Sequence, residues 1–64
     1  MITIVGRRSS HIELEADETV SSIMIRLGLS DNSYVCLING KPVTSDHMAH
    51  PGDSVTFLEV FSGG

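Results

Sequence analysis

A single short stripe of apolar residues at helical spacing limits the folds open to this chain. Val20, Ile23, Met24 and Leu27 follow the i, i+3, i+4, i+7 pattern of one helix face. A helix of about 9 residues does not persist alone in water, because too few hydrogen bonds offset the cost of its nucleation. We therefore expect it to pack against a sheet built from the rest of the chain.

Residues at both ends of this helix are suited to its free backbone groups. Thr19 is the expected N-cap, because its hydroxyl accepts a hydrogen bond from an N–H of the first turn. Asp17 and Glu18 lie at the start, where carboxylates suit the positive end of the helix dipole. Gly28 is the expected stop, since glycine adopts the left-handed conformation freely, and Leu29 then folds back on the helix.

Two segments before the helix alternate apolar and polar residues and are predicted to be strands. Residues 1–5 are rich in β-branched side chains, and residues 6–10 form a polar turn that leads to a second strand at residues 11–15. Ile12 and Leu14 are expected to face inward. The polar residues of that strand then face solvent: His11, Glu13 and Glu15.

After the helix, residues 34–38 are apolar throughout and predict a strand covered, or nearly covered, on both faces. Asn39 and Gly40 predict a type I′ hairpin, because both central positions of that turn need positive φ. Residues 41–43 are expected to return at a sheet edge, where the missing N–H of Pro42 is tolerated.

The last strand is predicted over residues 54–60, with Val55 and Phe57 directed toward the helix. Before it, residues 44–50 are expected to form one helical turn and residues 51–53 a tight turn. The alternate side chains of the last strand then point to the opposite face: Thr56 and Leu58.

These elements predict one α+β domain of order β-β-α-β-β-β, in which one helix covers one face of a mixed sheet. Residues 1–60 form the domain, and residues 61–64 form a flexible tail. Because crossover connections are right-handed, we expect the strand after the helix to pair beside the first strand.

Length and charge argue against several functional classes. A chain of 64 residues is near the lower size limit for folding alone and offers little concavity, so we expect no enzyme. The net charge of −4 disfavours nucleic acid and anionic membrane surfaces. No apolar run approaches the length of a membrane-spanning helix and no secretory signal opens the chain, so a cytoplasmic location is expected.

The sequence ends in Gly63 and Gly64, which lack side chains and suit a narrow channel in a partner enzyme. Residues 61–64 span up to about 13 Å when extended, enough to carry a terminal carboxylate into an active site. A carboxylate is a poor acyl donor until it is coupled to AMP, and the chain holds no nucleotide-binding motif. There are two alternatives to a functional tail. The two glycines are a frayed end, or the natural chain continues past Gly64 and is trimmed.

Five short motifs follow one another along the chain. They are Thr19-Val20 at the helix start, Leu27-Gly28-Leu29 at its end, Asn39-Gly40-Lys41-Pro42-Val43, Pro51-Gly52-Asp53-Ser54-Val55, and Val60-Phe61-Ser62-Gly63-Gly64. In their order and spacing they resemble the ThiS/MoaD family of ubiquitin-like β-grasp sulfur carriers. The resemblance covers essentially the whole chain and implies a β-grasp fold.

The resemblance implies a protein co-substrate that binds no cofactor itself. Family members are adenylated at the terminal glycine by a ubiquitin-activating-enzyme-like adenylyltransferase that uses ATP, and the adenylate becomes a thiocarboxylate. The sulfur goes to thiazole synthase in thiamine assembly, to the large subunit of molybdopterin synthase, or to tRNA thiolation. On this sequence, Gly64 carries the adenylate or thiocarboxylate and Gly63 enters the channel. The other residues expected to bind partners are Leu58, Val60, Phe61 and Ser62.

Leu58 and Val60 also indicate a docking surface on physical grounds. If Val55 and Phe57 face the helix, Leu58 and Val60 lie on the sheet face that has no second layer. An uncovered apolar patch usually marks a binding site. The alternative is that Leu58 is an ordinary exposed leucine and Val60 packs on the strand edge.

Two other functions are open on the sequence. A small ubiquitin-like modifier, joined to lysines of other proteins, uses the same activation, whereas a plain β-grasp interaction module keeps its tail unmodified. The length resembles the thiamine-type carriers and residues 57–64 resemble the molybdopterin type, so no pathway is assigned.

The remaining candidate groups have simpler explanations. One cysteine forms no internal disulfide or iron–sulfur cluster, and Cys36 is expected in the core, with a sulfur acceptor as the alternative. His47 and His50 are expected at the surface, since zinc needs further ligands, and no metal site is predicted. One acidic cluster forms a solvated face or steers a basic partner: Glu13, Glu15, Asp17 and Glu18.

Overall fold

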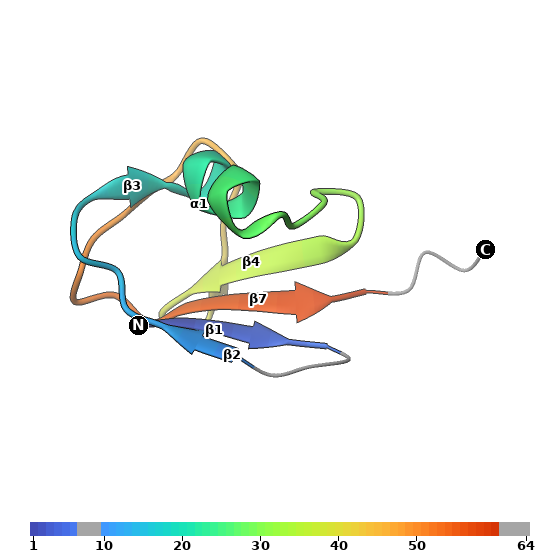
Figure 1. Cartoon of the computed structure of the whole chain (residues 1–64), viewed down its shortest axis with the longest axis horizontal. Coiled ribbons are helices and arrows are strands. Elements are labelled where there is room, and N and C mark those ends of the chain that lie inside the picture. Colours follow the sequence, from blue (N-terminus) through green and yellow to red (C-terminus); the bar gives the residue numbers. More distant parts are fainter. Residues whose placement is uncertain (7–9, 61–64) are drawn as a thin grey trace.

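The computed structural model describes residues 1–6 and 10–60, which form a sheet and one helix (Figure 1). The main sheet has the strand order β2-β1-β7-β4-β5. Its strands are β1 (Ile2–Val5), β2 (Ser10–Ile12), β4 (Tyr34–Ile38), β5 (Lys41–Pro42) and β7 (Val55–Glu59). The other elements are helix α1 (Val20–Leu27) and two short strands that pair with each other, β3 (Glu18–Thr19) and β6 (Met48–Ala49).

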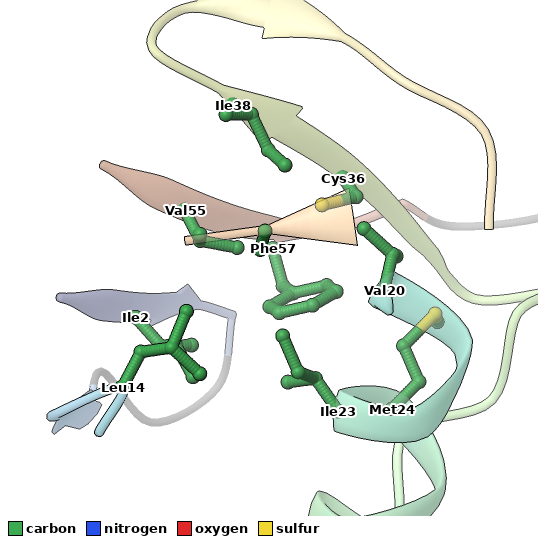
Figure 2. Packing of buried hydrophobic residues seen from close by; sticks show 10 residues of the cluster. Ile2, Leu14, Val20, Ile23, Met24, Cys36, Ile38, Val55 and Phe57 are labelled. Atoms are coloured by element: carbon green, nitrogen blue, oxygen red, sulfur yellow. The ribbon is translucent and has the colours of Figure 1, made fainter. Parts of the chain in front are cut away.

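Helix α1 lies over one face of the sheet, and buried side chains from both layers make the core (Figure 2). Phe57 of β7 and Ile23 of α1 are fully buried, and the Phe57 ring points from the sheet toward Ile23. Val55 is also buried, which confirms the predicted inward face of the last strand. One helix on one face of a mixed sheet of five strands confirms the predicted α+β, β-grasp class.

Both ends of α1 agree with the sequence prediction. The Ser22 N–H donates to the Thr19 hydroxyl at 3.1 Å, so Thr19 is the N-cap. Gly28 has a φ of +71°, and the Leu29 N–H donates to the Met24 carbonyl at 2.8 Å. This bond belongs to the Schellman ending, which satisfies a carbonyl that the helix leaves free.

Residues 44–50 pass the N-terminus of α1 without forming the predicted helical turn. The Val20 N–H donates to the His47 carbonyl at 2.9 Å, and the Ser21 N–H donates to the Ser45 carbonyl at 2.8 Å. The carbonyls of Ser45 and His47 therefore accept from the free N–H groups at the start of α1. They do not form the hydrogen bonds that a helical turn within residues 44–50 would need. The β3–β6 pair holds the same segment beside the helix start, and no sequence pattern predicts it.

Strand β7 lies between β1 and β4, so the expectation that the strand after the helix pairs beside the first strand is wrong. β1 runs parallel to β7, with Ile4 opposite Phe57, and β4 runs antiparallel to it, with Cys36 opposite Phe57. The crossover rule concerns the parallel strands that α1 connects, which are β2 and β4, and it fixes the hand of that connection but not adjacency; β1 and β7 lie between them. β7, whose inward-facing Val55 and Phe57 are fully buried, is the central strand of the sheet.

The outer face of β4 is open, which corrects the expectation that residues 34–38 are covered on both faces. Cys36 and Ile38 are buried under α1, whereas Val35 on the alternate face is 40% exposed. The physical reason is that a helix of eight residues has one apolar stripe and covers one face of a sheet.

Ile23 and Ile25 provide a matched test of the core, because both belong to α1 and Ile25 is 79% exposed whereas Ile23 is buried. Ile23→Ala is expected to lower the free energy of unfolding by about 2–5 kcal/mol, through lost burial and the cavity left behind. Ile25→Ala is expected to change it by less than about 0.5 kcal/mol. Urea unfolding followed by circular dichroism measures both, and equal losses would contradict the placement of Ile23 in the core.

Candidate functional site

Three apolar side chains from three strands form a row on the sheet face opposite α1. Leu58 of β7 is paired with Val5 of β1 on one side and with Val35 of β4 on the other. Residues directly opposite each other in paired strands place their side chains on the same face. Val5 and Val35 are each at least 40% exposed, so solvent reaches the row from both sides of Leu58.

Val60 extends this row toward residue 61. It follows Leu58 by two residues, and side chains alternate between faces along an extended chain. The Val60 N–H donates to the Ser33 carbonyl at 2.7 Å, and the Val60 side chain is exposed. We refer to Val5, Val35, Leu58 and Val60 as the apolar patch.

Two residues expected at a docking surface, Leu58 and Val60, therefore lie together on the uncovered face. The alternation of side chains along the last strand was the signal that placed them there. The remaining expected site residues lie outside the described residues: Phe61, Ser62, Gly63 and Gly64.

Val5 and Val35 belong to the apolar patch, although the sequence analysis did not select them. Val5 alternates with Ile4, but its place beside Leu58 depends on the parallel pairing of β1 with β7. For Val35 the usable signal was the single helix, which leaves one face of each strand without cover. The omission of Val5 concerns long-range pairing, and that of Val35 concerns the number of helices available to cover the sheet.

The neighbouring row on the same face is more polar. Thr3, Thr56 and Leu37 lie side by side across β1, β7 and β4, and the Thr3 hydroxyl is 3.4 Å from His11 Nδ1. Among the described residues, these two rows contain no Asp, Glu, Lys or Arg. An apolar centre depleted of charge and bordered by polar groups is the composition of a protein–protein interface core.

The acidic cluster lies beside α1 and not on the apolar patch. Arg26 Nη2 donates to Glu18 Oε1 at 2.9 Å, and the Ser22 hydroxyl donates to Glu18 Oε2 at 2.9 Å. These bonds, the one from Arg26 first, hold the pKa of Glu18 below its ordinary value. Glu18 is therefore paired with the last turn of α1, and with Glu13 and Glu15 it lines a shallow depression of about 500 Å³.

Cys36 contributes to a groove of about 380 Å³ between α1, β4 and residues 43–45. Its side chain is buried, and burial raises the pKa of the thiol to about 11. A sulfur acceptor needs an exposed thiol with a lowered pKa. The expectation of a core cysteine is confirmed, and the alternative role as a sulfur acceptor is wrong.

His50 forms an ion pair with Asp17 at the surface, with 2.9 Å between His50 Nδ1 and Asp17 Oδ1. The hydrogen bond to Asp17 and its negative charge raise the pKa of His50. His47 is exposed and uses its backbone carbonyl to accept from α1. Across residues 1–6 and 10–60, no three His, Cys, Asp or Glu side chains are grouped to hold a metal ion.

Fold and patch together define a ubiquitin-like β-grasp domain with an open apolar face beside its last strand. The sequence matches the family of small archaeal modifier protein 2 (SAMP2) over residues 1–61, and the chain belongs to that family. This is a family of ubiquitin-like β-grasp proteins, and the match does not extend to residues 62–64. Comparison with curated proteins gives no match. No helix in the described part of the chain is long and apolar enough to cross a membrane.

The His50–Asp17 pair predicts a small pH dependence of stability. Because the folded state raises the pKa of His50 above 6.5, the contribution is present below that value and is lost as pH rises through the folded pKa. Asp17→Asn is expected to return the pKa of His50 toward its ordinary value. NMR titration of the imidazole measures this, with Asp31→Asn, in the loop after α1, as the control for loss of charge. An unchanged His50 pKa in Asp17→Asn would show that the pair does not form in solution.

Proposed function

We propose that this chain is a ubiquitin-like protein modifier whose Gly64 carboxylate is activated by an adenylyltransferase of the ubiquitin-activating kind and joined to lysines of other proteins. The family match supports the modifier class. The chain is a co-substrate in this reaction, and the partner enzyme binds and uses the ATP.

The observation that carries the proposal is the position of the apolar patch. Leu58 belongs to β7, and Val60 follows that strand directly before residues 61–64. A partner that binds the patch lies next to the start of residues 61–64. Four extended residues span roughly 13 Å, so Gly64 stays within about that distance of the partner's surface. Docking of the domain then positions the terminal carboxylate for reaction, which reduces the entropic cost of the chemical step.

The activation follows from the weakness of a carboxylate as an acyl donor. A Gly64 carboxylate oxygen attacks the α-phosphorus of ATP, which forms an acyl-adenylate and releases pyrophosphate. A lysine amine then attacks the acyl carbon, and AMP leaves. Gly63 and Gly64 add no side chain to the segment that must enter the partner's channel.

Sulfur carriage is a second candidate, favoured by the ThiS/MoaD-like motifs along the whole sequence. The same acyl-adenylate accepts sulfur and gives a Gly64 thiocarboxylate. Such a thiocarboxylate would supply thiazole synthase, molybdopterin synthase or tRNA thiolation. A plain interaction module differs from both, because it uses the apolar patch but not Gly64.

Intact mass distinguishes these functions. The chain is incubated with ATP and its adenylyltransferase, once with acceptor proteins and once with a sulfur source. A conjugate mass equal to the two proteins minus one water supports the modifier, and exchange of one oxygen for sulfur at Gly64 supports the carrier. A variant with one residue added after Gly64 is expected to give neither product. An unchanged mass with an active adenylyltransferase would leave only the interaction module.

Leu58→Glu is expected to weaken binding of the adenylyltransferase about tenfold or more, because it places a charge at the centre of the apolar patch. Ile25→Glu is the matched control, since it adds the same charge at an exposed site on α1. Phe61→Ala is also expected to weaken binding. Calorimetric titration measures the affinities, and circular dichroism checks that each variant is folded. Wild-type affinity in a folded Leu58→Glu protein would remove the patch from the docking site.

A further inference from the structure

The groove beside Cys36 lies on the helix side of the sheet, away from the apolar patch. Its lining is mainly apolar and comes from α1, β4 and the segment after β5: Val20, Met24, Tyr34, Cys36 and Val43. A second hollow of about 300 Å³ adjoins it, and Met24, Asp31 and Ser45 line both. We refer to the two hollows together as the α1–β4 groove. A concave, mostly apolar surface with a few polar groups is typical of a ligand site.

The hairpin after β4 keeps the edge strand β5 to two residues. Asn39 and Gly40 have φ values of +53° and +83°, as the predicted type I′ turn requires. β5 returns beside β4 as far as Pro42, at the edge of the sheet as predicted. The Val43 N–H then donates to the Cys36 carbonyl at 3.1 Å.

Beyond this bond the chain turns from β4 toward the start of α1. The Ser21 N–H donates to the Ser45 carbonyl at 2.8 Å, which fixes residues 43–45 against the helix. The α1–β4 groove is therefore the gap that opens where this segment diverges from β4. Because hydrogen bonds hold both of its sides, a ligand has little chain to order on binding.

Tyr34 of β4 directs backbone groups into this gap. The Val60 N–H donates to the Ser33 carbonyl, so Ser33 occupies a hydrogen-bonded position of the β4–β7 ladder. Successive residues of a strand direct their N–H and C=O groups to opposite sides, so those of Tyr34 point away from β7. Within residues 1–6 and 10–60, no strand pairs with Tyr34 on that side. Unpaired groups at a sheet edge are a template for an added strand.

Asp31 supplies the charge of the groove. In the described part of the chain, no hydrogen bond or ion pair engages its carboxylate. Neither hollow is lined there by a lysine or an arginine. A cationic ligand group therefore meets a carboxylate without a competitor, and the net charge of −4 attracts a ligand of the same sign.

We infer that the α1–β4 groove binds an extended, basic segment of a partner protein. The main chain of this segment adds beside Tyr34 as a short strand. One apolar side chain enters the hollow against Met24 and Val43, and a neighbouring lysine or arginine pairs with Asp31. Because the apolar patch lies on the other face, one copy holds this segment and the adenylyltransferase together. The inference goes beyond the proposed function and needs no reaction at Gly64.

A phage-displayed library of random linear peptides, screened on the immobilised wild-type chain, supplies the probe. Enriched peptides are expected to alternate apolar and polar residues and to carry lysine or arginine. The strongest is synthesised, and its affinity is measured by calorimetric titration. In NMR spectra of the labelled chain, the Tyr34 amide is expected to shift and to exchange more slowly with solvent. Enrichment of acidic peptides, of none, or of peptides that leave the Tyr34 amide unchanged would overturn the inference.

Two N-methylated forms of this peptide test strand addition. Methyl groups on alternate backbone nitrogens block pairing along one edge of the peptide and leave the other edge intact. One form is expected to bind about tenfold or more weakly, because its pairing edge is blocked, and the other is expected to bind like the parent. Equal affinities of the two forms would contradict strand addition.

Ser45→Trp tests the position of the site, because Ser45 is exposed and a bulky side chain there fills the groove. Ser54→Trp is the matched control, since Ser54 is also exposed and its carbonyl likewise accepts from a backbone N–H, that of Asn39. Ser45→Trp is expected to weaken peptide binding about tenfold or more, and Ser54→Trp is expected to leave it unchanged. Wild-type affinity in a folded Ser45→Trp protein would contradict the site.

Asp31→Lys tests the charge, with Glu13→Lys as a control that makes the same change at an exposed site outside the groove. Asp31→Lys is expected to weaken binding about fivefold and Glu13→Lys less than about twofold, with a smaller difference at high salt. Equal effects would show that only net charge matters and would remove Asp31 from the site.

Two further results would overturn the inference while leaving the proposed function intact. Loss of peptide binding in folded Leu58→Glu would move the peptide to the apolar patch; Leu58 is used because Val35 also lines the groove. A chain that dimerises in sedimentation, and is returned to monomer by Ser45→Trp, would assign the groove to a second copy. Failure of Gly64 to react would remove the proposed function without changing the affinity for the peptide.

Discussion

The packing of Phe57 against α1 is the contact on which the other features depend. The ring fills the space between the sheet and Ile23, and it fixes which face of the central strand is buried. Side chains alternate along a strand, so the same contact places Thr56 and Leu58 on the outer face. A slip of one residue in β7 would exchange the two sets. One register therefore determines both the core and the apolar patch.

Signals that lie within a few residues of each other predicted the ends of the helix and the hairpin, but not the path of residues 44–50. Thr19 and Gly28 mark the helix ends, and Asn39-Gly40 marks the hairpin, because each needs a backbone conformation that few residues adopt. The position of β7 between β1 and β4 depends on pairing between distant segments, which alternation alone does not specify. The β3–β6 pair has two residues on each side and no apolar period, so no pattern predicts it. For the candidate site, Leu58 and Val60 followed from the alternation, Val5 required the pairing of β1 with β7, and Val35 could have followed from the single helix.

The small domain separates its groups onto different surfaces. The apolar patch lies on the open face of the sheet, the acidic depression lies beside α1, and Lys41 lies at the far edge. The one thiol, Cys36, is buried with a raised pKa, so it remains protonated near neutral pH. A free thiolate would compete with amines for an activated acyl group. Burial of Cys36 thus leaves the surface without a competing sulfur nucleophile among the described residues.

The central strand of the sheet is also the last of the strands within the described residues. During synthesis, β1, α1 and β4 leave the ribosome before the strand that joins them. Pairing between segments so distant in sequence is made late, after the entropic cost of closing the intervening chain. A prematurely terminated product lacks the centre of its sheet and the fully buried Val55 and Phe57, and cellular proteases remove such unfolded chains. The main sheet is therefore complete only on chains that extend through β7.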